Sequence, residues 1–239
     1  MSLLPTADGL TRRVGAWLGA LPSQCAVCHT WPARPLCDAC VSRFAQPVPR
    51  CRTCALRVPA GVTQCGECLR HPPALNSCLA ACDYAWPWTQ CIGRFKFEQQ
   101  AGWAAPLAQL MHSVPWADQA LDAADRVLPM PLFTRRLRER GFNQALELAR
   151  RLAPGRCDAT LLLRLRDTPA QAGLSRAQRL LNLRGAFALE PLRAQEVRGL
   201  RIVLVDDVMT TGASLSTAAQ VLRDAGAAHI TALVLARTA

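Results

Sequence analysis

The second half of the chain alternates short apolar runs with helical patterns. Four apolar runs, each bounded by proline, glycine or charged positions, predict buried strands at 126–132, 159–166, 200–208 and 229–237. Apolar residues recur at helical spacing through 145–152 and 214–225. Strands that are apolar on both faces and alternate with helices are typical of a parallel sheet. The pattern therefore predicts an α/β fold, with a parallel sheet flanked by helices.

The stretches between these elements are less regular. The segment HPPALNSCLAACDYAWPWTQCIGRFKFEQQ (71–100) has short apolar runs and a proline break, which predict a β-hairpin, and a helix should follow near 103–112. The segment FTRRLRERGFNQ (133–144) predicts a basic loop. The segment DTPAQAGLSRAQRLLNLRGAF (167–187) is polar, basic and interrupted by glycine and proline, and it predicts a mobile segment.

Cysteines dominate the first third of the chain. Eight of the 12 form four Cys-x2-Cys pairs, separated by 8, 10 and 10 residues: Cys25/Cys28, Cys37/Cys40, Cys51/Cys54 and Cys65/Cys68. A Cys-x2-Cys turn directs two thiolates at one tetrahedral metal centre, and a second pair completes the site. Four pairs in series predict about two structural zinc ions, because four thiolates leave no open position for catalysis.

The spacing leaves the pairing and the metal open. Neighbouring pairs would form one site from Cys25–Cys40 and another from Cys51–Cys68, whereas interleaved pairs would form a cross-brace. We favour neighbours, because short loops close at the least entropic cost. An iron–sulfur cluster is an alternative to zinc. The other four cysteines lack this spacing and are predicted to be small buried residues: Cys78, Cys82, Cys91 and Cys157.

The charge of the chain favours anionic partners. Its formal net charge is +11, and Lys96 is the only lysine among 28 basic residues. Such a surface attracts phosphorylated ligands or nucleic acid. No apolar run approaches the roughly 20 residues of a membrane span, and residues 14–21 suit an amphipathic helix better than a signal peptide. With cysteines spaced for metal, we expect a cytoplasmic protein.

Two adjacent carboxylates interrupt this basic chain. Asp206 and Asp207 follow the run RIVLV at the predicted strand end, where ligands of parallel sheets bind. The turn VMTTGAS then leads into a helix, with Gly212 placed for a tight turn and Ser214 as a predicted cap. Hydroxyls, backbone N–H groups and the positive helix end together predict a phosphate site. The carboxylates could accept hydrogen bonds from sugar hydroxyls or help to hold Mg²⁺.

Two other interpretations compete with a sugar-phosphate site. Apolar residues before two acids also occur in P-loop ATPases, but those need G-x4-G-K-[ST], and the single lysine lies in GRFKFE. A solvated strand end with an ordinary cap would explain the two acids alone. It does not explain the whole string IVLVDDVMTTGAS.

That string resembles the 5-phosphoribosyl-1-pyrophosphate (PRPP) motif of type I phosphoribosyltransferases. Together with VLPMPLFTRRLRERGFNQA, RDTPAQAGLSRAQRLLNLRGAF, LVLART and the cysteine pairs, it is similar to the ComF/GntX-like family over nearly all of 25–238. We expect an N-terminal helix or arm at 1–22, and the resemblance implies a double zinc ribbon at 23–73 and a phosphoribosyltransferase-like domain at 78–239. It also implies Mg²⁺ bound with PRPP.

The resemblance also implies roles for individual residues. Asp206 and Asp207 would bind the ribose hydroxyls at the catalytic centre. The 5′-phosphate would be held by Thr210, Thr211, Gly212, Ala213 and Ser214. Pyrophosphate and lid contacts would come from Arg135, Arg136, Arg140, Arg166, Gln171, Arg179 and Asn182. The mobile segment would be the lid.

Three functions fit these features. The first is a PRPP-dependent phosphoribosyltransferase with an unassigned acceptor, acting in DNA uptake (competence) or nucleotide metabolism. The second is a non-catalytic PRPP- or nucleotide-binding protein that binds single-stranded DNA through its basic surface and zinc ribbon, and the third is a PRPP sensor. The family's association with competence suggests a protein partner from that machinery. Lys96, in the string RFKFE, could mark a position that needs a compact ammonium and not a guanidinium, or it could be a chance survival on a hairpin edge.

Overall fold

The computed structural model describes residues 23–167, 183 and 185–239. The described chain forms two compact units, one ending at Arg43 and the other spanning Phe44–Ala239. Helix α2 (Asp38–Phe44) ends at this boundary. The second group of cysteines therefore belongs to the same unit as the sheet. The boundaries expected from the sequence for the arm, the zinc ribbon and the transferase domain stay a prediction.

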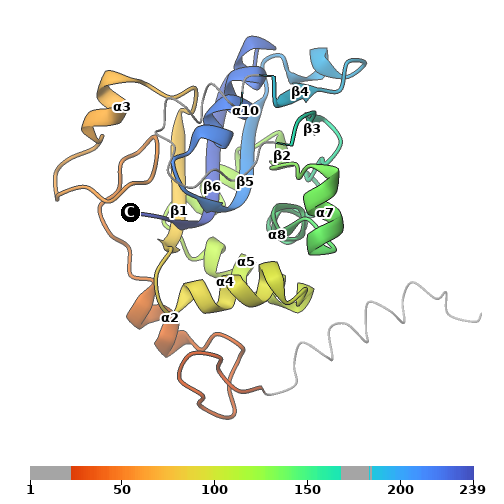
Figure 1. Cartoon of the computed structure of the whole chain (residues 1–239). Helices are drawn as coiled ribbons and strands as arrows, with labels where there is room; N and C mark the ends of the chain where they lie inside the picture. Colours follow the sequence, from red (N-terminus) through yellow and green to blue (C-terminus); the bar gives the residue numbers. More distant parts are fainter. Residues whose placement is uncertain (1–22, 168–182, 184) are drawn as a thin grey trace, which may run out of the picture. The chain divides into compact units, whose positions relative to one another are not determined.

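The larger unit is built on a four-stranded parallel sheet (Figure 1). Its strands lie in the order β1 (Ser77–Asp83), β6 (His229–Arg237), β5 (Arg201–Met209) and β2 (Arg126–Pro129). In β5, Ile202 and Leu204 alternate with Val203 and Val205, and all four are buried. Burial on both faces explains why this strand is an unbroken apolar run.

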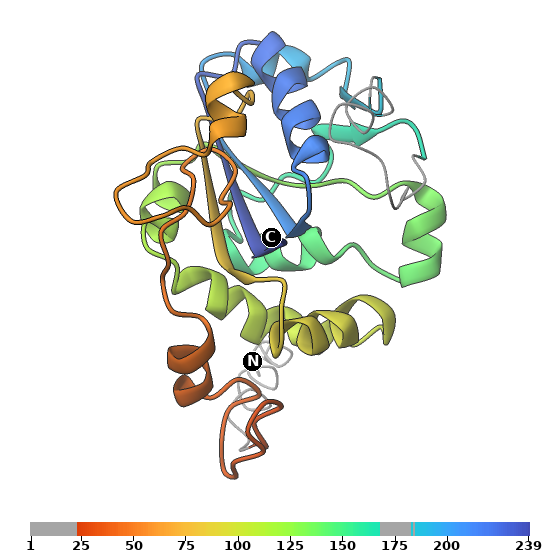
Figure 2. The ribbon, with the colours of Figure 1, turned by 60° about the vertical axis from the view of Figure 1, so that its left-hand side comes forward.

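Helices cover both faces of the sheet. Figures 1 and 2 show α10 (Ala213–Asp224) on one face, and α5 (Ala104–His112) with α8 (Gln144–Leu152) on the other. The buried side of α10 consists of Ala213, Leu215, Ala218, Ala219 and Leu222. The predicted α/β class, a parallel sheet flanked by helices, is confirmed. Shorter elements are α3 (Gly66–Arg70), η1 (Ala101–Trp103), α6 (Ala117–Asp122) and η2 (Ala194–Val197).

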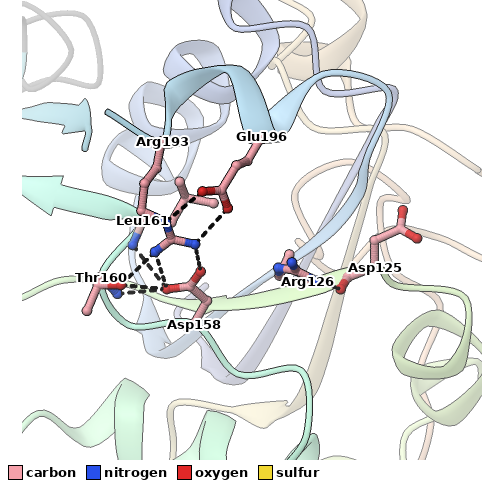
Figure 3. Close-up of polar contacts among 7 residues, drawn as sticks. All are labelled: Asp125, Arg126, Asp158, Thr160, Leu161, Arg193 and Glu196. Carbon is pink, nitrogen blue, oxygen red and sulfur yellow. Dashed lines mark hydrogen bonds and ion pairs between the residues drawn. The ribbon is translucent and has the colours of Figure 1, made fainter. Parts of the chain in front are cut away.

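A two-stranded antiparallel hairpin stands beside the main sheet. It pairs β3 (Leu162–Arg164) with β4 (Phe187–Leu189). Figure 3 shows the polar cluster at its base, where Asp158 accepts hydrogen bonds from the backbone N–H groups of Thr160 and Leu161. The Arg193 guanidinium lies 2.7 Å from Asp158 and 2.8 Å from Glu196. The cluster ties η2 to the start of β3 and so fixes the root of the hairpin.

The β-hairpin predicted within 71–100 is wrong. Strand β1 is followed by helix α4 (Trp88–Phe97). Trp88, Cys91, Ile92 and Phe95 are buried on one side of α4, at a spacing that is helical and not alternating. The short apolar runs concealed this spacing. Helix α4 matters to the site because it carries Lys96.

The basic loop predicted at 133–144 is also wrong in part. Residues Thr134–Arg140 form helix α7, which ends at Gly141 with φ 77°. Asn143 then caps α8, because its side chain accepts hydrogen bonds from two backbone N–H groups of that helix. Short charged helices without a buried side leave no apolar period in the sequence, and α7 has no buried residue.

Other predicted elements hold with shifted ends. The strands at 126–132 and 159–166 are shorter than predicted, while β5 extends to Met209. The three remaining cysteines of the sheet and α4, Cys78, Cys82 and Cys91, are buried as predicted, whereas Cys157 is only partly buried. Among the described residues, no helix combines the length and apolar character needed to cross a membrane.

Candidate functional site

The two adjacent acids lie at the carboxyl end of β5. The strand continues two residues beyond them to Met209, so their backbone is fixed by pairing with β6. Asp207 is 6% exposed, and Asp206 is partly buried. The Asp207 backbone N–H donates to the Asp206 carboxylate. This position agrees with the edge at which parallel sheets bind ligands.

The single lysine of the chain pairs with this acidic site. Lys96 Nζ lies 2.9 Å from Asp207 Oδ1, and the two side chains are only 11% and 9% exposed. Helix α4 presents the lysine, and Phe95 on that helix packs against Phe142 with ring centroids 5.3 Å apart. A buried pair of this kind is costly to desolvate and is weak evidence of stabilisation. It therefore points to a role in the site.

The acids influence each other electrostatically. Burial, and then the neighbouring Asp207 carboxylate, raise the pKa of Asp206 to about 7. The positive charges of Lys96 and Arg140 act in the opposite direction. Burial and the neighbouring carboxylate thus both disfavour the charged form of the Asp206 carboxyl.

Cations surround the acids across a small polar cavity. The cavity measures about 160 Å³ and is bordered by both acids and by Lys96, Met130, Pro131, Leu132, Arg136, Arg140, Asn143, Gln144, Ala145, Arg164, Val208 and Ser214. Arg164 reaches it from β3, with its guanidinium 5.3 Å from the Phe187 ring centroid. Burial lowers the pKa of Arg164, and the charge of Arg136 adds to this effect. Four cations beside two acids suit a ligand with a polyanionic part and a hydroxylated part.

The turn after β5 leads into the amino terminus of α10. Gly212 has φ 75°, and a Cβ at this position would collide with the Met209 methyl group. Glycine adopts this left-handed conformation without strain, whereas another residue would be strained and would displace the end of the Met209 side chain. Helix α10 begins at Ala213, so the predicted cap at Ser214 is wrong: Ser214 lies inside the first turn, and the Thr211 hydroxyl accepts from the Ala213 N–H.

The structure brings together some of the residues singled out from the sequence. Asp206, Asp207, Arg136, Arg140 and Ser214 border one cavity. Thr210, Thr211, Gly212 and Ala213 form the turn beside it. Arg135 is 61% exposed and pairs with Asp167 at 2.7 Å. Arg166 is exposed beyond the end of β3. Gln171, Arg179 and Asn182 lie outside the described residues.

Three site residues had no role assigned from the sequence. Lys96 stands out in the sequence as the single lysine, but the predicted hairpin gives it no connection to the acids. Arg164 lay in a predicted strand with no motif around it. Gln144 ends the string RGFNQ, in which no pattern predicts a function for this residue. The helical spacing of Trp88, Cys91, Ile92 and Phe95 could have placed Lys96 on a helix.

The eight paired cysteines form two groups of neighbours, and the cross-brace alternative is wrong. In each group the four sulfur atoms lie within 4.8 Å of one another. The sulfurs of Cys28 and Cys37 are 3.6 Å apart, and those of Cys54 and Cys65 are 3.7 Å apart. Four thiolates about 2.3 Å from a tetrahedral zinc ion would be separated by about 3.8 Å. Each group could therefore hold one zinc ion.

Comparison with known proteins finds one matching protein family and several relatives whose names refer to DNA utilization or competence. Residues 137–239 match the family described as "Phosphoribosyl transferase domain". The "DNA utilization protein YhgH" of Salmonella typhimurium is 36% identical over 176 residues, which cover 71% of this chain and 76% of that protein. The "Competence protein F" of Haemophilus influenzae is 33% identical over 71% of this chain and 76% of its own length.

A third relative matches a shorter stretch. The "Competence protein ComFC" of Bacillus subtilis is 35% identical over 113 residues, covering 47% of this chain and 44% of that protein. The matches to the first two relatives extend over more than two thirds of both partners, and the parallel sheet and the cysteine groups agree with them. The chain belongs to the ComF-like family of proteins with a phosphoribosyltransferase domain.

Proposed function

We propose that the cavity at the end of β5 binds PRPP together with Mg²⁺, and that the protein is a phosphoribosyltransferase of DNA uptake or nucleotide metabolism. The observation that carries this proposal is the meeting of two acids with four cations beside the turn 210–214. Carboxylates accept hydrogen bonds from the ribose hydroxyls, while arginines face the diphosphate. The reduced thiols needed for zinc fit a cytoplasmic location.

The chain's own residues would orient the donor for displacement. Asp206 and Asp207 hold the ribose, and the hydroxyls and N–H groups of 210–214 hold the 5′-phosphate. An acceptor nitrogen forms a bond to C1′ as the bond from C1′ to the diphosphate oxygen breaks, and pyrophosphate leaves with the electron pair. The arginines stabilise its charge. Bound Mg²⁺ would supply further charge neutralisation, and oxygen ligands such as Asp206 and Asp207 suit this ion.

Calorimetry tests the proposal directly. PRPP should bind to the wild-type protein in the presence of Mg²⁺, and Asp207→Asn should weaken this binding by about tenfold or more, because a hydrogen-bonded charge is lost. Asp122→Asn is the matched control, since Asp122 is exposed on α6. Equal affinities of the wild type and Asp207→Asn would refute the assignment. A screen of nucleobases for pyrophosphate release would then identify the acceptor.

A second function rests on the charge of the chain and on the names of its relatives. We infer that a non-catalytic PRPP- or nucleotide-binding protein could bind single-stranded DNA through its basic surface and zinc ribbon, alone or with a competence protein. The formal net charge of +11 favours contact with phosphates. Affinity for an oligonucleotide should then fall steeply with salt. Absence of binding at low salt would exclude this function.

A further inference from the structure

Gln144 carries a buried hydrogen-bond donor without an acceptor. It is the first residue of α8, is 1% exposed and borders the cavity of the acids. Its Oε1 accepts from Arg140 Nη1 at 3.0 Å. Among the described residues, no group accepts a hydrogen bond from its Nε2. Because an arginine nitrogen can only donate, this contact fixes which end of the amide faces Arg140.

The buried Gln144 Nε2 donor, which has no acceptor in the described part of the chain, needs an explanation. The large majority of buried side-chain polar atoms in proteins have a hydrogen-bond partner, and an unsatisfied one destabilises the fold. The adjacent residue shows the usual arrangement: Asn143 Nδ2 donates to the Met130 carbonyl, and Asn143 Oδ1 accepts from the Ala145 and Leu146 N–H groups. Both polar atoms of the Asn143 side chain thus have partners within the fold. Within the residues that the structure describes, the Gln144 amide has a partner only at Oε1, and this residue borders the cavity.

The surroundings define what the missing acceptor is. The cavity is bordered by the cations Lys96, Arg136, Arg140 and Arg164, so its occupant is an anion. Ribose hydroxyls are served by the carboxylates of Asp206 and Asp207, which accept hydrogen bonds. A diphosphate has only acceptor oxygens in its ionised form, and it requires donors and cations. Gln144 Nε2 supplies a donor next to the Arg140 guanidinium.

We propose that Gln144 is a ligand-contacting residue whose Nε2 donates a hydrogen bond to a diphosphate oxygen of the bound phosphoribosyl diphosphate. This inference rests on the proposed PRPP site and adds a specificity determinant to it. The amide favours a diphosphate at C1′ over a ligand that bears only a hydroxyl there. Arg140 holds the amide in place through Oε1, and the ligand completes its hydrogen bonding.

Two substitutions isolate the donor. Gln144→Glu keeps an acceptor for Arg140 and nearly the same shape, but it loses the donor and adds a negative charge. Gln144→Met keeps the neutral charge and the length, but it loses the donor and the acceptor for Arg140. The loss of the Nε2 donor is the property that both variants share. Gln119→Met, on the exposed surface of α6, is the control for a general effect of the substitution.

The probes are PRPP, inorganic pyrophosphate and ribose 5-phosphate, each measured by calorimetry with Mg²⁺. We expect both Gln144 variants to bind PRPP and pyrophosphate about tenfold more weakly or worse, with ribose 5-phosphate unchanged. Gln144→Glu should unfold at a temperature no lower than the wild type, because it removes an unsatisfied donor and pairs with Arg140. A purely structural glutamine would instead show a lower unfolding temperature and unchanged binding.

The outcomes separate this inference from the PRPP proposal. If the wild type binds none of the probes, the PRPP proposal fails and this inference fails with it. If the wild type binds PRPP and Gln144→Met binds it equally well, only this inference is overturned. Weakening in Gln144→Glu alone would mean that repulsion by the added charge causes the effect, and it would overturn the inference as well.

Discussion

The two groups of four cysteines share a motif but differ in their surroundings. The first group, Cys25–Cys40, belongs to the small unit, where Cys28 is exposed and Cys37 partly exposed. The second group, Cys51–Cys68, belongs to the unit of the sheet, and three of its four cysteines are buried. The same Cys-x2-Cys turns therefore belong to a small separate unit in the first group and to the core of the larger unit in the second group.

Contacts of the second group explain this difference. Cys51, Cys54 and Cys68 belong to one apolar cluster with residues of β1, β5 and α10. The Cys78 backbone N–H of β1 donates to the Arg52 carbonyl between two of these cysteines. A metal bound there would therefore stabilise the sheet as well as its own loop.

Arg237 connects the second group to the candidate site. Its side chain is 7% exposed, and Nε donates to the Cys54 carbonyl at 2.9 Å. Nη1 of the same residue donates to the carbonyl of Met209, the last residue before the turn 210–214. One guanidinium thus joins a cysteine turn to the strand end that precedes the proposed phosphate turn. The first group shares no unit with that site.

The largest effect should come from removing ligands of the second group. Cys54→Ser with Cys68→Ser should abolish metal binding there and cost several kcal/mol, because structural zinc contributes about 10–16 kcal/mol in zinc-finger peptides. A domain is stable by only about 5–15 kcal/mol, so we expect no cooperative unfolding transition. Denaturant titration followed by fluorescence of the buried Trp88 and Trp103 measures this.

Cys25→Ser with Cys28→Ser is the matched pair in the first group. It should remove one zinc ion per chain and leave the unfolding of the larger unit within about 1 kcal/mol of the wild type. Equal destabilisation by both pairs would show that the two groups play the same role.

Arg237→Met should have the next largest effect. The buried Cys54 and Met209 carbonyls would each lose a hydrogen bond, at a cost of about 1–3 kcal/mol. PRPP affinity should also fall, because the strand end before the turn 210–214 is less constrained. Arg223→Met is the control: Arg223 also donates to backbone carbonyls, including that of Ala74, but lies at the opposite end of the strands. A similar loss of affinity in both variants would disprove the connection.

A chelator should remove zinc from the two cysteine groups at different rates. A chelator reaches the exposed Cys28 more easily than the buried Cys51, Cys54 and Cys68. We therefore expect zinc to leave in two phases, with the fast phase missing in Cys25→Ser/Cys28→Ser. Release in one phase from the wild type would contradict the contrast in burial.

The smallest expected effect is a loss of stability at low pH. It arises from the polar cluster of Asp158, Arg193 and Glu196 shown in Figure 3. Hydrogen bonds from Arg193 lower the pKa of Asp158 from 3.8 to about 2. Because the folded pKa is the lower one, this stabilisation is present above pH 3.8 and is lost as the pH falls toward 2. Zinc thiolates also bind protons in acid, and we expect metal release to come first.

Metal release and circular dichroism followed along one acid titration would test this order. Asp158→Asn should remove the later change while leaving zinc release unaltered. A later change that persists in Asp158→Asn would assign it to other carboxylates.

The sequence by itself determined the features that depend on local spacing. The Cys-x2-Cys turns, the apolar period of β5 and α10, and the acids followed by TTGAS are encoded within short windows, where backbone geometry alone fixes which side chains meet. Even the pairing of neighbouring cysteines followed from loop length. The family and the fold class could therefore be predicted.

The tertiary structure decided which distant residues share the site. Lys96 meets Asp207 only because α4 is a helix and packs through Phe95 against Phe142. Arg164 reaches the cavity from a hairpin, and Gln144 is left with an unused donor by the packing of α8. Such contacts depend on burial and on the packing of whole elements, which no local pattern records. The same reason explains why two identical cysteine motifs differ, one within its own unit and one within the core.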